Sequence, residues 1–277
     1  MGERETAGTE ALLQSRERRC MNACSRYLRR DPSKDRVWTL RGSDGDLCAV
    51  MVHAKQSLFP VFCGQKNIPP PRFLRTHVMQ SLFGTIRIHS LQGQKEDAVI
   101  LETVLEKTGL FAAENIDYDT MCIDRPPAGF HSSGPANLVI RKPQNTDMDT
   151  LVALHAAYEQ EEVLPAKSEF NAAISRINTA RIFRDEQVLV AELDGRVVGK
   201  INTNAVSFTR CQIGGVYVHP DYRGRGIARR MTGEFAAGIV ASGKGISLFV
   251  KKTNSAARNI YQNIGFEFFG DYRISYY

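Results

Sequence analysis

The sequence predicts a mixed α/β fold, in which a central sheet is flanked by helices. Residues 216–228 have the pattern of a strand, a proline- and glycine-rich turn and the start of a helix. In that helix apolar residues recur every four positions from Ile227 to Ile239, the spacing of one buried helix face. Upstream, Asp194-Gly195 separates two strand-like runs and predicts a two-residue hairpin turn.

Bulk composition is that of a globular protein. The 277 residues can hold two ordinary domains, and an apolar content of 43% is normal for such chains. No apolar run is long enough to cross a bilayer, and the charged N-terminal stretch lacks an apolar signal core. We therefore expect a cytoplasmic protein with no membrane partner.

The cysteines and the net charge narrow the expected partners. The six cysteines, at positions 20, 24, 48, 63, 122 and 211, include no Cys-x-x-Cys pair. This spacing predicts reduced thiols and no metal. A net charge of +6 suits an anionic cofactor. It also suits nucleic acid, but no zinc-finger or RNP-like aromatic pattern supports that partner, so nucleic acid is not expected.

The first part of the chain alternates predicted helices and strands. Its expected elements are a helix over 6–30, strands near 37–40, 47–53 and 58–62, a helix from the prolines at 69–71 through Leu82, a strand at 85–88, a helix over 97–108 and a strand over 116–123. Proline, glycine and serine then predict a linker over 125–136. We expect an accessory α/β domain over 1–124, which is either a degenerate copy of the fold that follows or an unrelated cap.

The second predicted domain spans 137–277. Its expected elements are a strand over 138–141, helices over 147–160 and 169–179, strands over 188–193, 196–207 and 209–218, a helix from 227 to about 242, a strand over 246–251, a helix from Asn254 and a final strand. This order predicts a mixed sheet flanked by helices. The aromatic last strand would allow a homodimer by strand pairing if it lies at a sheet edge.

The turn Arg223-Gly224-Arg225-Gly226 precedes a predicted helix, whose first N–H groups and dipole favour an anion. Glycine allows close approach and unusual backbone angles, and the arginines add charge. The sequence therefore predicts a phosphate site. It is not a nucleoside-triphosphate loop, because no Gly-Lys-Ser/Thr follows. It is not a dinucleotide fingerprint, because Arg229 stands in place of the third glycine.

A second motif lies downstream of this turn. Steps of three and four residues place Asn254, Ala257 and Tyr261 on one face of a helix. Gly265 is a natural left-handed helix end, and Phe266 opens the next strand.

The two motifs together resemble the sequence patterns of the GNAT superfamily of N-acetyltransferases. The matching residues are Arg223, Gly226 and Ala228 in the first pattern, and Asn254, Ala257, Tyr261, Gly265 and Phe266 in the second. The resemblance covers roughly the second half of the chain. It implies a GNAT fold there, acetyl-CoA as co-substrate and direct transfer of the acetyl group to an amine. The first domain would then be a degenerate GNAT-like unit or an unrelated cap.

The resemblance also implies where the cofactor binds. The backbones of Val216 and Val218 would meet the pantetheine arm, and the amides of 225–228 the pyrophosphate. A strand bulge at Gly214-Gly215 would help to open the sheet. Asn254 would touch the arm or simply cap its helix. The expected cofactor-binding residues are Val216, Tyr217, Val218, Arg223, Gly224, Arg225, Gly226, Ile227, Ala228, Asn254 and Tyr261.

Three residues are candidates for the chemistry. By resemblance, the Tyr261 hydroxyl would donate to the departing thiolate; otherwise it is a packed aromatic. The acceptor amine must also lose a proton. The segment 209–215, where many family members carry a carboxylate, has none. Glu161 and Glu162 are therefore the candidate bases, although they also fit an ordinary acidic surface.

The sequence thus predicts an acetyl-CoA-dependent N-acetyltransferase that acts on a small-molecule amine. Two alternatives remain open. One is a non-catalytic sensor or interaction module that binds CoA or acetyl-CoA. The other is an acetyltransferase that modifies protein or RNA.

Overall fold

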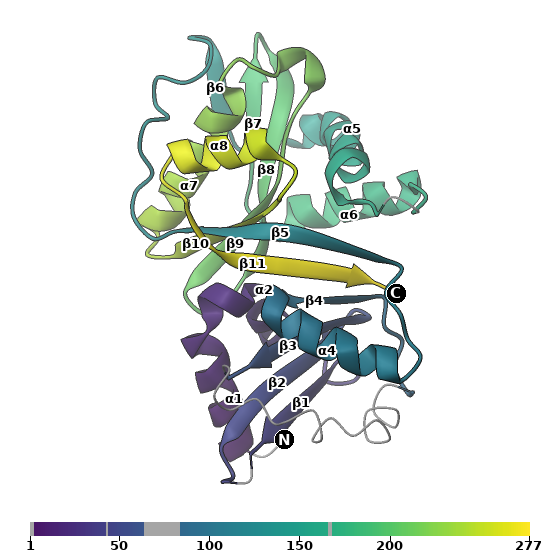
Figure 1. Cartoon of the computed structure of the whole chain (residues 1–277). Coiled ribbons are helices and arrows are strands. Elements are labelled where there is room, and N and C mark those ends of the chain that lie inside the picture. Colours follow the sequence, from purple (N-terminus) through teal and green to yellow (C-terminus); the bar gives the residue numbers. More distant parts are fainter. Residues whose placement is uncertain (1–2, 43, 64–83, 166–167) are drawn as a thin grey trace. The chain divides into compact units, whose positions relative to one another are not determined.

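The computed structural model describes residues 3–42, 44–63, 84–165 and 168–277. The chain forms two compact units: Met1–Thr120 with Phe269–Tyr277, and Met121–Phe268. Each unit has strands with helices packed beside them (Figure 1). The predicted mixed α/β fold, with an additional N-terminal α/β unit, is confirmed.

The first unit combines two distant parts of the sequence. β1, β2 and β3 pair antiparallel in chain order, β4 joins β3 in parallel, and the last strand, β11, pairs antiparallel with β4. The elements are α1 (Glu3–Ser15), α2 (Glu17–Leu28), β1 (Arg36–Arg41), β2 (Leu47–Ala54), β3 (Ser57–Phe62), β4 (Ser90–Gln94), α4 (Lys95–Lys107), β5 (Glu114–Ile123) and β11 (Glu267–Tyr276), the last two being shared with the second unit.

Two helices of this unit were predicted differently. The single helix expected over 6–30 is divided at Arg16, whose φ of −113° and ψ of 10° leave the helical range. The helix expected to end at Leu82 lies outside the described residues.

The strand predicted at 85–88 is wrong, and the strand forms instead at Ser90–Gln94. Ile86 and Ile88, which alternate with polar residues in the sequence, are partly buried against an apolar cluster that includes Leu101. Alternating burial therefore arose here without strand pairing.

The second unit has the element order that the sequence predicts. Its elements are β6 (Leu138–Arg141), α5 (Met148–Tyr158), α6 (Ala172–Asp185), β7 (Val188–Leu193), β8 (Arg196–Val206), β9 (Arg210–Val218), α7 (Ile227–Ala241), β10 (Gly245–Lys251) and α8 (Ser255–Asn263), followed by the start of β11. β6 to β9 pair antiparallel in chain order, and β10 pairs with β9 in parallel.

The second helix of this unit begins and ends later than the predicted 169–179. The side chain of Asn171 accepts a hydrogen bond from the backbone N–H of Ile174 and so caps α6, which then runs to Asp185. The cap, rather than the apolar pattern, fixes where this helix starts.

The core of the second unit includes the segment predicted as a linker. The apolar face of α7 is buried from Ile227 to Ile239, as its spacing predicts. Phe130 is buried against this helix, and a Cβ on Gly233 would lie 2.1 Å from the Phe130 ring. The compact units therefore differ from the predicted segments 1–124, 125–136 and 137–277. Residues 125–136 pack within the second unit, and residues 269–277 belong to the first.

β11 lies between β4 and β5 in the first unit. It has no free edge, so the edge pairing considered for a homodimer is not available to this strand. Among the described residues, no helix has the length and apolar character needed to span a bilayer.

Candidate functional site

The site begins at a bulge in β9. Lys200 of β8 lies opposite Tyr217, but Asn202 lies opposite Gly214, so β9 carries an extra residue between them. Gly215 adopts a φ of +58°, and a Cβ there would lie 2.1 Å from Asn202 Oδ1 and 2.7 Å from Lys200 Nζ. Only glycine fits this position, and the bulge predicted at Gly214-Gly215 is present.

The two parallel strands separate after this point. The register between β9 and β10 joins Arg210–Ile213 to Gly245–Leu248, whereas the strands themselves continue to Val218 and Lys251. On its β10 side, the last part of β9 therefore extends beyond the paired region. This leaves a place where an extended ligand could meet strand backbone.

Just beyond β9, the glycine turn leads into α7. Gly224 and Gly226 have φ values of +75° and +78°, and Gly226 is the residue that begins α7. No heavy atom lies within 4 Å of a Cβ built on Gly224, whereas one built on Gly226 would lie 2.7 Å from the backbone nitrogen of Gly134. The first N–H groups of the helix are thus presented on a turn that only glycine forms without strain.

The two arginines of the turn brace its backbone. Arg223 Nε donates to the carbonyl of Val218 at 2.9 Å, and its guanidinium lies 5.1 Å from the centre of the Tyr217 ring. Arg225 donates to the carbonyl of Asp221 at 3.1 Å. Their charge still lies beside the helix start.

Glu161 lies in a π-helical turn, Glu159–Val163, that follows α5. Arg223 donates to its carboxylate at 2.7 Å, and the hydroxyl of Tyr217 donates to the other carboxylate oxygen. Partial burial opposes ionisation, but these two hydrogen bonds outweigh it and hold the pKa of Glu161 below its ordinary value. Burial and the same carboxylate raise the pKa of Tyr217 to about 12.

Glu162 contacts α8 rather than the glycine turn. Its carboxylate accepts a hydrogen bond from Asn254 Nδ2 at 3.1 Å. The other side-chain atom of Asn254, Oδ1, accepts from the N–H of Ala257 at 3.0 Å and caps α8. The capping alternative for Asn254 is therefore correct, and the same side chain also joins Glu162 to the site.

Tyr261 is buried on α8, with 8% of its surface exposed. Its ring lies 5.9 Å from that of Phe266. Burial, together with the neighbouring Tyr158 and Glu162, raises its pKa well above the ordinary value. Tyr261 is thus both a packed aromatic and a hydroxyl that keeps its proton at neutral pH.

Sequence reasoning missed a buried polar group behind the bulge. Lys200 is 3% exposed, and its Nζ lies 4.9 Å from the centre of the Tyr158 ring. Burial lowers the pKa of Lys200 to about 7 and raises that of Tyr158 to about 12. Burial also lowers the pKa of the nearby His155 to about 3, and the charge of Lys200 lowers it further.

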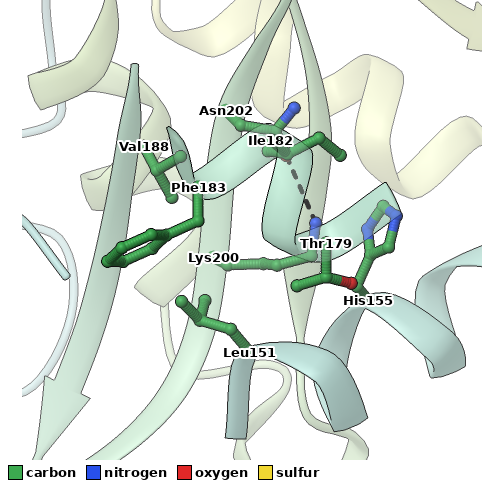
Figure 2. Close-up of a pocket in the computed structure, with 8 residues that line it drawn as sticks. All are labelled: Leu151, His155, Thr179, Ile182, Phe183, Val188, Lys200 and Asn202. Atoms are coloured by element: carbon green, nitrogen blue, oxygen red, sulfur yellow. Dashed lines mark hydrogen bonds between the residues drawn. The ribbon is translucent and has the colours of Figure 1, made fainter. Parts of the chain in front are cut away.

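One signal in the sequence could have revealed Lys200. It falls in the middle of a predicted strand, two residues after Val198, so the two side chains are expected on the same face of the sheet. A lysine at an inward position of a central strand must be buried and paired. Figure 2 shows it pointing among the residues that line a small cavity between the sheet and the helices α5 and α6, of about 10 Å³.

The bulged strand, the left-handed glycine turn and the tyrosine helix define an α/β unit of the acetyltransferase type. Residues 184–268 match the family model of the acetyltransferase (GNAT) domain. Residues 184–268 are therefore similar to a GNAT acetyltransferase domain. Over 83 residues it is 37% identical to an acetyltransferase of Sodalis glossinidius, and the match covers 28% of this chain and 56% of that protein. The chain thus spans little more than half the length of this curated relative.

Solved structures share the fold over nearly the whole chain. A GCN5-related N-acetyltransferase from Sphaerobacter thermophilus has a TM-score of 0.57 at 18% identity, covering 97% of this chain and 90% of that one. A Drosophila protein has a TM-score of 0.60 at 15% identity, covering 96% and 89%. Because these matches include the first unit, they favour a GNAT-like unit there over an unrelated cap.

Proposed function

We propose that the protein is an acetyl-CoA-dependent N-acetyltransferase that acts directly on a small-molecule amine. The observation that carries the proposal is the separation of β9 from β10 immediately before the glycine start of α7, within the segment that matches the GNAT domain. Strand backbone suits the amide-containing arm of the cofactor, and a helix start suits its phosphates.

The residues present fit this cofactor. The space around Gly224 is open, and the left-handed Gly226 turns the chain into the helix start where phosphate would bind. The backbone of Arg225–Ala228 would hold the pyrophosphate, and that of Val216–Val218 the pantetheine arm. Asn254, the N-cap residue of α8, would touch the same arm. When bound, the cofactor supplies an acetyl group activated as a thioester.

The chain's own side chains then have distinct roles in this proposal. The Tyr261 hydroxyl, which keeps its proton, donates to the sulfur as it leaves. Glu162 accepts the proton of the amine, directly or through water; its carboxylate is hydrogen-bonded to the neutral Asn254, whereas that of Glu161 is paired with Arg223. Glu161, bound by Arg223 and Tyr217, braces the glycine turn.

The test is a calorimetric titration with acetyl-CoA and CoA, followed by thiol release with a library of amines. Saturable binding of acetyl-CoA together with amine-dependent thiol release supports the enzyme. Binding without turnover, with protein and RNA acceptors included, supports the sensor alternative. Failure to bind either CoA compound contradicts both. A cytoplasmic location remains a prediction that localisation of the tagged protein would check.

A further inference from the structure

The carbonyl of Gly215 is held by a side chain that lies outside the GNAT sequence patterns. Lys200 Nζ donates to the carbonyl of Gly215 at 3.0 Å. The backbone of Gly215 also lies near the hydroxyl of Tyr158, whose pKa it lowers against the larger effect of burial. Lys200 also donates to Asn202 Oδ1 at 3.3 Å, the contact drawn as a dashed line in Figure 2. The carbonyl of the bulge residue is therefore fixed by a buried side chain.

This arrangement determines the direction of the following N–H group. A trans peptide is planar, so the carbonyl of Gly215 and the N–H of Val216 point in opposite directions. A carbonyl held toward Lys200 turns the Val216 N–H away from it. Val216 is the first of the β9 residues whose backbone is assigned to the pantetheine arm.

We propose that Lys200 is a positioning residue for acetyl transfer: it holds the carbonyl of the Gly215 bulge and so aims the Val216 N–H at the bound thioester arm. The inference rests on the proposed function. Lys200 has no direct role in the chemistry, because its Nζ is occupied by Gly215 and Asn202. A buried ammonium needs hydrogen-bond partners, and Lys200 has them in Gly215 and Asn202.

The decisive variant is Lys200→Met, which keeps an unbranched side chain one atom shorter and removes the donor. We expect kcat to fall about tenfold or more, since small displacements of a reacting group have effects of that size. The KM for acetyl-CoA and the Kd for CoA should stay within about threefold, because most of the cofactor contacts remain. The backbone amide resonances of Gly215 and Val216 should move.

Ile182→Val is the matched control. Ile182 lines the same cavity as Lys200, but it reaches neither the bulge nor the glycine turn in any described contact. It reports the cost of disturbing the cavity alone, and its kcat should match that of the wild type. An unchanged kcat in Lys200→Met, or an equal loss in Ile182→Val, overturns the proposal.

A pH titration of the wild-type amide resonances does not depend on the variant folding. The charged and titratable groups around Lys200 are His155, Tyr158 and Glu159, and Arg181 of α6 acts on His155 as Lys200 does. With pKa values of about 3, 7 and 12 for His155, Lys200 and Tyr158, the Gly215 and Val216 amides should titrate near pH 7. If the Gly215 and Val216 amides do not move at the pH at which the Lys200 side chain itself titrates, the lock is overturned.

The two proposals fail in different ways. If the wild type transfers no acetyl group to any acceptor, the proposed function fails. The lock on Gly215 is then still judged by the two amide resonances. If the wild type is active and Lys200→Met is equally active, only the positioning role fails.

Discussion

The hydroxyl of Tyr217 donates a hydrogen bond to the carboxylate of Glu161, although the two residues are separated by 56 positions in the sequence. Tyr217 belongs to the bulged strand β9, and Glu161 to the π-helical turn after α5. Arg223 of the glycine turn binds the other oxygen of the same carboxylate. One exposed carboxylate thus joins three segments of the candidate site, which leads to the first prediction.

Glu161→Gln should destabilise the protein at pH 7 by about 0.2–1 kcal/mol, the range for an exposed ion pair. The folded-state pKa of Glu161 is depressed. The contribution of the ionised Glu161 to the free energy of unfolding is therefore fully present above the ordinary glutamate pKa of about 4.3. It is lost as the pH falls through the folded-state pKa. Urea unfolding at pH 7 and near pH 3 measures this difference. Equal destabilisation at both pH values would exclude the charge effect, and the exposed Glu169→Gln serves as control.

Tyr261→Phe should reduce kcat by about 10²-fold or more, the usual contribution of a positioned proton donor. The Kd for CoA should change less than about threefold, because the ring and its packing remain. Steady-state kinetics and calorimetry on the same sample check the two values. Tyr276→Phe, in the part of β11 that belongs to the first unit, controls for the loss of a hydroxyl. Full activity in Tyr261→Phe would remove the proposed role.

Glu162→Gln should lower kcat and abolish the acidic limb of its pH profile, because the amide cannot accept the proton of the amine. A glutamine can still accept the hydrogen bond of Asn254, so the capping of α8 and the melting temperature should be retained. A pH–rate series of both proteins tests this expectation. A variant whose profile matches that of the wild type would exclude Glu162 as the base.

Gly226→Ala and Gly224→Ala form a matched pair. Both glycines have positive φ, so each substitution should cost about 1–2 kcal/mol in backbone strain. At Gly226 the new Cβ would also meet the backbone nitrogen of Gly134 at 2.7 Å, whereas at Gly224 it meets open space. Gly226→Ala should therefore melt at the lower temperature and lose more CoA affinity. Thermal unfolding and calorimetry compare the two, and an identical loss would show that the contact with Gly134 is unimportant.

Much of the second unit could be predicted because its signals are local. The apolar face of α7, the Asp194-Gly195 turn and the glycine bulge each depend on residues close in sequence. The contacts of Glu161 and Glu162 could only be suggested, because they join segments far apart in the chain.

The buried contacts of Lys200 could not be predicted at all. They depend on the β8–β9 register, which shifts twice in opposite senses: once at the bulge and once between Thr203 and Ala205. Periodicity along one strand does not report such shifts in pairing. The same limit applies to β11, whose pattern gives no sign that most of it belongs to the first unit.

The division of β11 between the units has a consequence for the order of folding. Domains generally fold as they are synthesised, the N-terminal one first. Here the first unit needs Phe269–Tyr277 to occupy the place between β4 and β5. Every strand that lies wholly in the second unit is made before that segment emerges. The first unit therefore cannot be completed until the later unit has been synthesised. Until then β4 lacks the hydrogen-bond partners that β11 supplies.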